Sequence, residues 1–517
     1  MSDSPAQQSG PDLAHGVPTD ALADGKMLVG HVGADPVLLA RSGGEYFAIG
    51  AECTHYHGAL ADGLMVGETV RCPLHHACFN LRTGEAVSAP AFDPVACWSV
   101  AVRSNKVFVL GKVETAARAP AVVAGEWPQQ VVIVGGGAAG FAAAEMLRRQ
   151  HYKGSLVMLS EDDAPPVDRP NLSKDYLDGS APEDWVPLRP QAYYAEQGID
   201  LRLKSLVVAI DTRARELELG DGSKVSYDQL LLATGAEPVR LTIPGMDLPH
   251  VHTLRSLADT RAIIAGTSTA RSVVVMGASF IGLEVAASLR KRGLEVHVVA
   301  PDKRPMERVL GPAMGDFVRG LHEAHGVIFH LEDSATAIDA HQVTLVSGAT
   351  IAADLVVVGV GVRPRLALAE KAGLTLDRGV VVDARLETSV PGIYAAGDIA
   401  RWPDPHSGES MRVEHWVVAQ RQGQTAALNM LGGQAKFDAV PFFWSQHYDV
   451  AINYAGHAQS WDELTIEGDI ARRDCAVRYK SKGRLLAIAT INRDAENLMA
   501  EITMEGEAAW SLDGRSF

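Results

Sequence analysis

Val131-Val132-Ile133-Val134-Gly135-Gly136-Gly137-Ala138-Ala139-Gly140 is the stretch of this sequence that decides its fold. Its four leading apolar residues predict a buried strand, and the glycines behind them predict a tight turn into a helix over residues 141–149. Gly135, Gly137 and Gly140 have the spacing of a dinucleotide-binding turn. There the three glycines permit the turn itself, the approach of a pyrophosphate and close packing of the helix.

An acidic residue follows the next predicted strand, which covers residues 155–160. Glu161 comes 21 residues after Gly140, and a carboxylate at that place can accept hydrogen bonds from an adenosine ribose. A glycine turn alone is weak evidence, but strand, turn, helix and acid in register favour a dinucleotide site. The candidate contacts in this segment are Gly135, Gly137, Ala139, Gly140 and Glu161.

The composition limits the classes of protein to which this chain can belong. Its 517 residues are enough for three or four domains. A formal net charge of −16 disfavours nucleic acid as a partner, because a polyanion would be repelled. The first 16 residues lack the basic and apolar regions of a secretory signal, and no stretch predicts a membrane span. Five scattered cysteines indicate a reducing compartment, so we expect a cytoplasmic protein.

Short apolar runs alternate with turn residues from about Asp12 to Glu114, which predicts an all-β module. Within it, Cys53-Thr54-His55 and Cys72-Pro73-Leu74-His75 each supply one thiolate and one imidazole. A structural zinc site uses the same residue types, but its cysteines and its histidines usually come as close pairs. One of each per segment better suits a two-iron cluster, in which one iron binds both sulfurs and the other both imidazoles. The candidate metal ligands are Cys53, His55, Cys72 and His75.

This pattern, Cys-x-His followed by Cys-x-x-His, resembles the Rieske [2Fe-2S] domain. Respiratory-chain Rieske proteins carry an additional disulfide, and here Gly58 and Leu74 stand where its cysteines would be. The resemblance is therefore to the soluble, ferredoxin-like Rieske domains of bacterial oxygenase systems. We interpret His57 and His76 as surface imidazoles, with tuning of the cluster as the alternative. The remaining cysteines, expected to be buried thiols, are Cys78, Cys97 and Cys475.

Further segments complete a first nucleotide-binding domain. Arg169 and Lys174 lie in a proline-rich loop that holds them near the pyrophosphate side of the sheet, although two solvated surface cations would give the same pattern. Strand-and-turn segments follow at residues 231–236 and, much later, at 388–398. Together they resemble the FAD-binding half of the two-dinucleotide flavoprotein reductases. The resemblance places Asp398 on the ribityl chain, with the following helix pointing at the flavin; a helix cap is a compatible structural role. The implied contacts are Ala233, Thr234, Gly235, Gly397 and Asp398.

The segment Val273–Glu284 repeats the strand, turn and helix, so a second nucleotide-binding domain is inserted into the first. Its candidate contacts are Gly277, Ser279, Gly282, Glu284 and Gly361. Ser279 departs from the pattern because it replaces the middle glycine. Ala300 takes the place that corresponds to Glu161, and Lys303 and Arg304 follow it. NADH is favoured by the resemblance, while these two cations leave NADPH open.

Glu284 falls one turn into the second predicted helix. The resemblance implies that it pairs with Lys174 across the flavin face, and the alternative is a favourable contact with the helix dipole. Lys174 and Glu284 are the catalytic candidates. The flavin half contains neither Cys-x-x-x-x-Cys nor Cys-x-x-Cys, which excludes the dithiol mechanism of disulfide reductases. Hydride transfer to flavin remains, followed by the departure of single electrons to the cluster.

The carboxyl-terminal part predicts a small domain with strands at residues 469–477 and 485–490. It resembles the interface domain of ferredoxin reductases of oxygenase systems and of apoptosis-inducing factors. The whole chain resembles the Rieske-containing, apoptosis-inducing-factor-like reductases. Trp416 and Trp444 are candidates to cover the isoalloxazine ring, with ordinary core packing as the alternative.

The sequence thus predicts a multi-domain protein with an all-β part and two α/β nucleotide-binding parts. The expected limits are 12–114 for the Rieske domain, 115–128 for a linker, 129–250 with 368–433 for the FAD-binding domain, 251–367 for the NAD(P)-binding domain, and 434–517 for an α+β interface domain. The implied function is an NAD(P)H oxidoreductase that passes electrons through FAD to a [2Fe-2S] cluster and on to a separate oxygenase or haem monooxygenase. The alternative is an NADH-responsive redox sensor or interaction protein. A monomer or a homodimer is expected.

Overall fold

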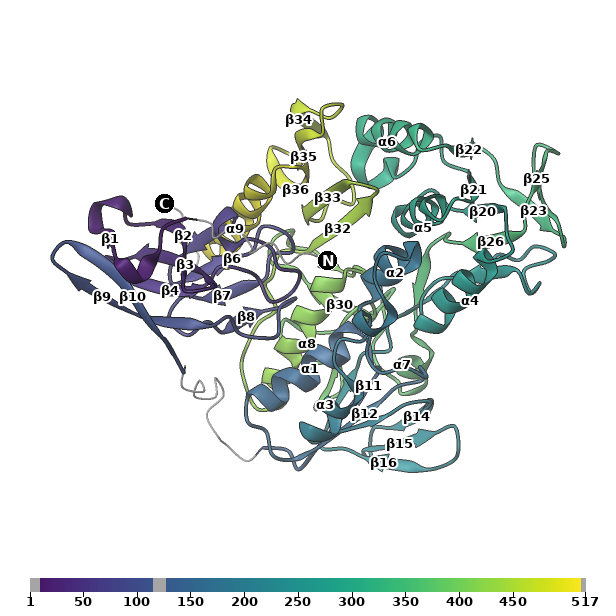
Figure 1. Ribbon diagram of the computed structural model, residues 1–517. Helices are drawn as coiled ribbons and strands as arrows, with labels where there is room; N and C mark the ends of the chain where they lie inside the picture. The colour runs from purple at the N-terminus through teal and green to yellow at the C-terminus, as the bar shows by residue number, and fades with distance from the viewer. Residues whose placement is uncertain (1–9, 115–126, 513–517) are drawn as a thin grey trace. The chain divides into compact units, whose positions relative to one another are not determined.

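A computed structural model describes residues 10–114 and 127–512 (Figure 1). Residues 115–126, which make up most of the predicted linker, lie outside the described residues. The described chain divides into two compact units, one of residues 10–114 with 493–512 and one of residues 127–492. No helix in these described ranges is long and apolar enough to cross a membrane.

The first unit is built mainly from two antiparallel sheets. The larger has the order β1-β10-β9-β4-β3-β2 and the smaller β5-β6-β7-β8. The strands are β1 (Val17–Pro18), β2 (Lys26–Val32), β3 (Asp35–Ser42), β4 (Glu45–Gly50), β5 (Leu64–Val66), β6 (Thr69–Arg71), β7 (Cys78–Asn80), β8 (Ala86–Ser88), β9 (Cys97–Arg103) and β10 (Lys106–Val113). Alternate residues of β3 enter two cores, with Leu38 and Ala40 in one and Val37 and Leu39 in the other. Strand β3 is therefore covered on both faces, and the predicted all-β module is confirmed.

The second unit begins with a parallel sheet of order β13-β12-β11-β17-β29. Its strands are β11 (Gln130–Val134), β12 (Ser155–Leu159), β13 (Ile199–Arg202), β17 (Gln229–Leu232) and β29 (Ile393–Ala395), and the helices α1 (Ala138–Arg149) and α8 (Trp416–Met430) pack against each other beside it. Residues 131–134 are buried because the sheet is covered on both faces, as their uninterrupted apolar run predicts. Strand β29, from much later in the chain, forms one edge of the sheet beside β17.

A second parallel sheet has the order β19-β26-β20-β21-β22. Its strands are β19 (Val251–Thr253), β20 (Ser272–Met276), β21 (Glu295–Ala300), β22 (Val327–Leu331) and β26 (Leu355–Val358), with the helices α4 (Leu257–Thr267), α5 (Phe280–Lys291) and α6 (Glu307–Ala324). It lies between the early strands and β29 in the sequence, which is the insertion that the repeated motif predicts.

Smaller elements connect and cover these sheets. They are β14 (Val207–Asp211), β15 (Glu216–Leu219), β16 (Lys224–Ser226), β18 (Ala236–Pro238), β23 (Ala335–Ile338), β24 (Gln342–Leu345), β25 (Thr350–Ala352), β27 (Val362–Pro364), β28 (Val380–Val381), β30 (Ala400–Pro403), β31 (Ser410–Met411), α2 (Asp175–Asp178), α3 (Gln191–Glu196) and α7 (Ala367–Lys371).

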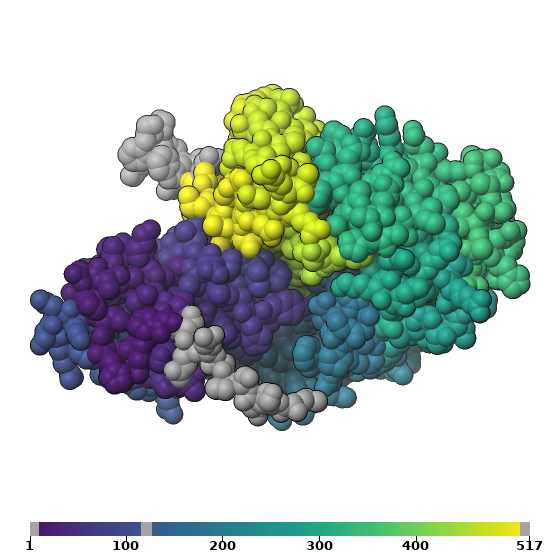
Figure 2. Space-filling model, turned by 45° about the horizontal axis from the view of Figure 1, so that its top comes forward, coloured from purple at the N-terminus to yellow at the C-terminus, as the bar shows by residue number. Residues whose placement is uncertain are grey.

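An antiparallel sheet of order β32-β33-β36-β35-β34 completes the second unit. Its strands are β32 (Phe442–His447), β33 (Val450–Gly456), β34 (Glu463–Asp469), β35 (Asp474–Ser481) and β36 (Arg484–Ile491). Figure 2 shows this sheet against α6, where the Tyr479 hydroxyl donates to the Leu310 carbonyl at 2.9 Å. The predicted strand over 485–490 lies within β36. The predicted strand over 469–477 is correct only from residue 474, because a turn separates Asp469 from Asp474 and the Asp469 side chain accepts from the backbone N–H of Ala471.

Helix α9 (Asp494–Leu512) follows that sheet in the sequence but groups with the first unit, where it contacts β5. The expected domain limits remain predictions.

Candidate functional site

A cavity of about 730 Å³ in the second unit is lined by residues of both glycine turns. Its size is that of a site for a cofactor or a small ligand. Most of the predicted nucleotide contacts line it: Gly137, Ala139, Arg169, Lys174, Ala233, Gly235, Ser279, Gly282, Glu284, Gly361, Gly397, Asp398, Trp416 and Trp444. The predicted contacts outside this lining are Gly135, Gly140, Glu161, Thr234 and Gly277.

The outer glycines of the first turn are required by close backbone packing. Gly135 has φ +117°, and a Cβ there would lie 2.1 Å from the carbonyl oxygen of Ala233. A Cβ on Gly140 would lie 1.9 Å from the carbonyl oxygen of Gly135. Both distances are too short for any side chain, so these residues shape the turn and do not themselves face the cavity.

The middle position of each turn does not need glycine for its backbone conformation. Gly137 has φ −85° and Ser279 has φ −101°, and both values suit any residue. A Cβ on Gly137 would lie 3.2 Å from Nη1 of Arg169, so the guanidinium occupies the space beside the first turn. The departure from glycine at Ser279 is therefore tolerated, because no backbone strain has to be relieved there.

Arg169 and Lys174 flank a short 3-10 helix, η4 (Arg169–Ser173). Their side chains are only 22% and 12% exposed, which favours contacts within the site over the alternative of surface cations. Burial lowers the pKa of Arg169 to about 10, so the guanidinium stays protonated at neutral pH. A buried positive group beside a glycine turn at the start of α1 suits a pyrophosphate.

Glu284 lies on α5 with 4% of its side chain exposed. Its Oε2 accepts from Lys174 Nζ at 2.8 Å and from Ser173 Oγ at 2.6 Å, and its Oε1 accepts from Ser445 Oγ at 2.6 Å. The Lys174–Glu284 pair that the resemblance implies is present in the structure. Glu284 lies beyond the first turn of α5, where the helix dipole contributes little, so the ion pair is the better supported of the two roles. Sequence reasoning missed Ser173 and Ser445; the first is adjacent to Lys174 and could have been found.

Asp398 lies at the carboxyl end of β29 and lines the cavity. Its carboxylate pairs with Arg255 at 2.5 Å, a partner that the sequence did not reveal. The helix-cap role is wrong, because strand β30 follows Asp398 and the next helix, α8, begins at Trp416 with His415 as its N-cap. The start of α8 nevertheless lines the cavity.

Aromatic side chains form part of the cavity wall. Lys174 Nζ lies 5.9 Å from the centre of the Trp444 ring. His415, which sequence reasoning missed although it precedes Trp416, packs against Phe443 with ring centres 4.6 Å apart. Burial lowers the pKa of His415 to about 3, so this ring is neutral in the wall of the site.

Glu161 follows β12 and is half exposed, where it forms an ion pair with Arg365. Arg304, a candidate for a 2′-phosphate, pairs with Asp316 at 2.7 Å and with Glu307 at 3.2 Å. Its charge is therefore already compensated within the protein.

Two loops of the first unit carry the predicted metal ligands in matching backbone conformations. Cys53 N–H donates to the Gly58 carbonyl at 2.9 Å, and Cys72 N–H donates to the Ala77 carbonyl at 2.8 Å. The fifth residue of each loop, His57 and His76, has positive φ. The shared geometry places Cys53 and Cys72 at equivalent positions of the two loops, while His55 is the third residue of its loop and His75 the fourth.

The ligands lie as two like pairs. Cys53 and Cys72 share a hydrogen bond, which lowers the pKa of the Cys53 thiol. The Nδ1 atoms of His55 and His75 are 3.2 Å apart, and burial lowers the pKa of His55 to about 4, which keeps it in the neutral form that binds metals. No three His, Cys, Asp or Glu side chains of the described residues form a group that could hold one metal ion. Two pairs fit a two-iron cluster better than a single zinc ion.

The neighbouring histidines differ from each other. His57 is 80% exposed, as expected. The expectation that His76 is a surface imidazole is wrong: it is fully buried, and its Nδ1 lies 2.5 Å from the buried carboxylate of Glu501 on α9. Arg71 lies 3.4 Å from Glu501 and makes a bidentate pair with Glu505. His76 and Glu501 are more than 400 positions apart in the sequence, so the sequence alone did not predict their contact. Of the other cysteines, Cys97 and Cys475 are buried and Cys78 is partly buried.

Replacement of Glu501 by leucine is expected to loosen α9 from the first unit. The change leaves the buried His76 and Arg71 without this carboxylate, and breaking a buried ionic contact costs about 3–5 kcal/mol. Hydrogen exchange of the α9 amides should become much faster. Glu496→Leu is the control. Glu496 is also on α9, but its side chain is exposed, and its ion pair with Arg493 is expected to contribute only about 0–1 kcal/mol. Equal exchange in the two variants would refute the role of Glu501.

Gly58 leaves no room for a side chain beside the ligand loops. A Cβ there would lie 2.9 Å from Cys72 Sγ and 2.9 Å from Leu74 Cδ1. Gly58→Ala is therefore expected to displace Cys72, to cost about 1–3 kcal/mol of stability and to lower the content of iron and acid-labile sulfide. Gly111→Ala is the control, since nothing lies within 4 Å of a Cβ there. Unchanged iron in the Gly58 variant would contradict this account.

Comparisons with known proteins agree with this architecture. Residues 129–423 match the family described as pyridine nucleotide-disulphide oxidoreductase, residues 16–99 match the Rieske [2Fe-2S] domain, and residues 442–512 match the reductase C-terminal domain. Human apoptosis-inducing factor 3 is 33% identical over 506 residues, which covers 94% of this chain and 83% of that protein. The ferredoxin–NAD(+) reductase component of the anthranilate 1,2-dioxygenase system of Burkholderia cepacia is 37% identical over 343 residues, covering 65% of this chain and 84% of that protein. The structure of a covalent putidaredoxin reductase–putidaredoxin complex superposes with a TM-score of 0.71 and 31% identity, covering 73% of this chain and 93% of that chain.

Two parallel nucleotide-binding sheets around one cavity, joined to a Rieske domain, define a flavoprotein oxidoreductase with an iron–sulfur module. The chain belongs to the pyridine nucleotide-disulphide oxidoreductase family. Its cofactors are FAD, a nicotinamide nucleotide and a [2Fe-2S] cluster. Despite the family's name, Cys475 is the only cysteine after residue 97, so a redox dithiol in the flavin half is excluded.

Proposed function

We propose that the cavity seats FAD against the first glycine turn and the nicotinamide against the second. Arg169, beside Gly137, and the start of α1 would bind the pyrophosphate, and Asp398, fixed by Arg255, would hold the ribityl chain. Trp416 and Trp444 would border the ring system. The flavin supplies the conversion of one hydride into two single electrons, and the residues of this chain supply orientation and electrostatics.

Ser279, Gly282 and Glu284 would bind and orient the nicotinamide, with Lys174 opposite. The compensated charge of Arg304 removes one of the two cations that leave NADPH open and so favours NADH as the donor, although Lys303 beside it is exposed. Glu161 would accept from the adenosine ribose of FAD, and its ion pair with Arg365 would fix the carboxylate for this role.

Cys53 and Cys72 would bind one iron of the cluster, and His55 and His75 the other. Tyr56 stacks on His55 with ring centres 4.2 Å apart and would shield the imidazole pair from solvent. The single observation that carries this assignment is the arrangement of the ligands as a thiol pair and an imidazole pair on two matching loops.

The final acceptor we propose is a separate oxygenase or haem monooxygenase. The B. cepacia relative belongs by name to a dioxygenase system, and the full ligand pattern of an electron-carrying Rieske domain supports onward transfer. The absence of a disulfide among the five cysteines, all within the described residues, supports the expected cytoplasmic location.

The similarity to human apoptosis-inducing factor 3 over nearly the whole chain favours one other candidate, an NADH-responsive sensor. Rapid steady-state reduction of a one-electron acceptor would support the reductase. Slow turnover with an NADH-dependent change in oligomeric state, measured by light scattering, would support the sensor instead.

The proposed function is tested by the composition of the purified protein and its response to each nicotinamide. We expect FAD, two irons and two sulfides per chain from the cluster type. NADH should bleach the flavin much faster than NADPH does. A protein that holds zinc in place of iron, or that lacks flavin, would overturn the proposal.

A further inference from the structure

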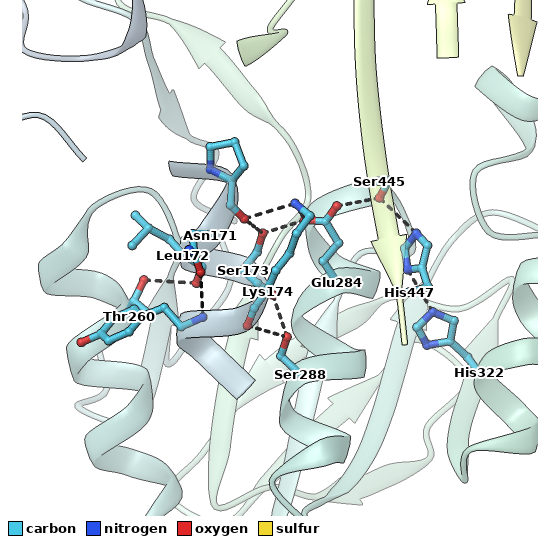
Figure 3. A network of polar contacts seen from close by, with 12 residues as sticks. Asn171, Leu172, Ser173, Lys174, Thr260, Glu284, Ser288, His322, Ser445 and His447 are labelled. Carbon is cyan, nitrogen blue, oxygen red and sulfur yellow. Dashed lines mark hydrogen bonds and ion pairs between the residues drawn. The ribbon is translucent and has the colours of Figure 1, made fainter. Parts of the chain in front are cut away.

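The carboxylate of Glu284 is the end of a buried chain of polar side chains (Figure 3). While Oε2 faces Lys174, Oε1 accepts from Ser445 Oγ at 2.6 Å. Ser445 Oγ lies 3.0 Å from His447 Nε2, and His447 Nδ1 lies 3.3 Å from His322 Nε2. The chain thus runs from the cavity wall through β32 to α6.

The carboxylate fixes the direction of every hydrogen bond in this chain. A hydroxyl has one hydrogen, so Ser445 donates to Glu284 and must accept from His447. His447 then carries its hydrogen on Nε2, and its Nδ1 accepts from the Nε2–H of His322. Each donor points toward Glu284, and His322 Nδ1 is left as an acceptor at the far end.

The two imidazoles are held neutral. Ser445, His447 and His322 are all fully buried. Burial lowers the pKa of His447 to about 3, with the nearby Lys174 as a second cause, and burial lowers the pKa of His322 well below its usual value. A neutral imidazole can accept a proton on one nitrogen while it releases one from the other, so it passes a proton on without trapping it.

An ordinary structural crosslink is the simplest alternative, and the far end of the chain argues against it. His322 Nδ1 is buried, and no described residue is its hydrogen-bond partner, which a crosslink has no reason to leave at a cost of about 1–3 kcal/mol. The side chains next to His322 connect it to the protein surface. Tyr448 packs edge-on against the His322 ring, and the exposed His325 stacks on Tyr448 with ring centres 3.6 Å apart. Asp449 and Arg290 are the charged groups near this pair.

We propose that Ser445, His447 and His322 relay a proton between Glu284 and the solvent beyond α6. The proposal rests on the proposed function. Oxidation of one NADH by two one-electron acceptors yields NAD⁺, two reduced acceptors and one proton, and a proton taken up by the buried carboxylate of Glu284 has to leave it again.

The transfer balances atom by atom. It begins with a proton on Glu284 Oε1 and with both rings protonated on Nδ1. The Glu284 proton moves to Ser445 Oγ while the Ser445 proton moves to His447 Nε2. The Nδ1 proton of His322 leaves the buried chain to a water that would have to reach this ring beside Tyr448 and the exposed His325, after the Nδ1 proton of His447 has moved to His322 Nε2. The product has an ionised Glu284 and both rings protonated on Nε2, which is the arrangement that the structure's hydrogen bonds require.

These three residues act through Glu284 and are positioning residues for the proton. Ser445→Ala removes the link next to Glu284, and Ser445→Thr restores a hydroxyl. Thr260→Val is the matched control, because Thr260 is a buried hydroxyl of α4 that bonds the backbone carbonyls of Leu172 and Ser256 and not the chain.

The experiment follows flavin reoxidation by ferricyanide and proton release to an indicator dye in one anaerobic stopped-flow trace. In the native protein, Ser445→Thr and Thr260→Val, proton release should keep pace with reoxidation. In Ser445→Ala it should lag by about tenfold or more. Equal proton release in Ser445→Ala would overturn the relay.

A second readout needs no turnover. Nitrogen-15 NMR of the resting holoprotein should show His447 and His322 as neutral Nε2–H tautomers between pH 6 and 8, which spans the usual pKa of histidine, about 6.5. An Nδ1–H tautomer or a charged ring at His447 would contradict the proposal. If NADH fails to reduce the flavin at all, the proposed function fails, while the NMR result still judges the relay.

Discussion

Replacement of Cys72 by serine is expected to remove the iron–sulfur cluster and to leave the flavin reducible by NADH. Cys72 is 1% exposed and shares a hydrogen bond with Cys53, so the thiol pair is preorganised for one iron. The serine hydroxyl is a much weaker iron ligand than a thiolate, so the variant holds the cluster by three of its four ligands. Iron content should fall to near zero, and the paramagnetic signal of the reduced cluster should disappear.

The rate at which NADH bleaches the flavin should stay within about twofold of the native rate, because the cavity belongs to the other unit and hydride transfer takes place there. Cys78→Ser is the control, since Cys78 lies in the same unit outside the two ligand pairs. A Cys72 variant that keeps its full iron and sulfide would refute the ligand assignment.

Replacement of Glu284 by leucine is expected to damage both stability and catalysis. The change leaves the ammonium of Lys174 and the hydroxyls of Ser173 and Ser445 without their shared acceptor in a buried place. Loss of one partner of a buried ion pair costs about 3–5 kcal/mol, so the unfolding midpoint should fall clearly. Flavin reduction by NADH should slow by about tenfold or more, because Lys174 loses its fixed position.

Glu284→Gln is the informative companion to this variant. The amide keeps the size of the side chain and one acceptor oxygen but removes the charge, so most of the packing is preserved while the ion pair is lost. Its stability should lie between those of the native protein and the leucine variant. If the leucine variant unfolds at the native midpoint and is reduced at the native rate, Glu284 does not organise the site.

The main outlines of the fold follow from local patterns in the sequence. Residues 131–140 and 273–284 each place a short apolar strand, a glycine turn and a helix in direct succession, and these contacts form between neighbours in the chain. The ligand loops around Cys53 and Cys72 are likewise local. This is why the two sheets and the all-β module could be predicted, whereas the pairing of Lys174 with Glu284, 110 residues apart, came only from the family resemblance.

The features that the sequence did not reveal depend on distant contacts. Ser445 and His447 meet Glu284 and His322 only because β32 packs on α5 and α6, and hydrophobic periodicity does not specify which side chains meet across that contact. Glu501 reaches His76 from the opposite end of the chain. The strand predicted at 469–477 starts too early for a local reason. Asp469 and the residues after it form a hairpin turn, and the alternating apolar residues on both sides of the turn resemble one continuous strand.

The central claim is that electrons from NADH reach the cluster through the flavin. It is tested most directly by anaerobic titration of the native protein with NADH, in which flavin absorbance and the paramagnetic signal of the reduced cluster are recorded on the same samples. We expect the cluster signal to grow as the flavin is reduced, and to be absent from the Cys72→Ser variant. A cluster that stays oxidised after the flavin is fully reduced would contradict the account.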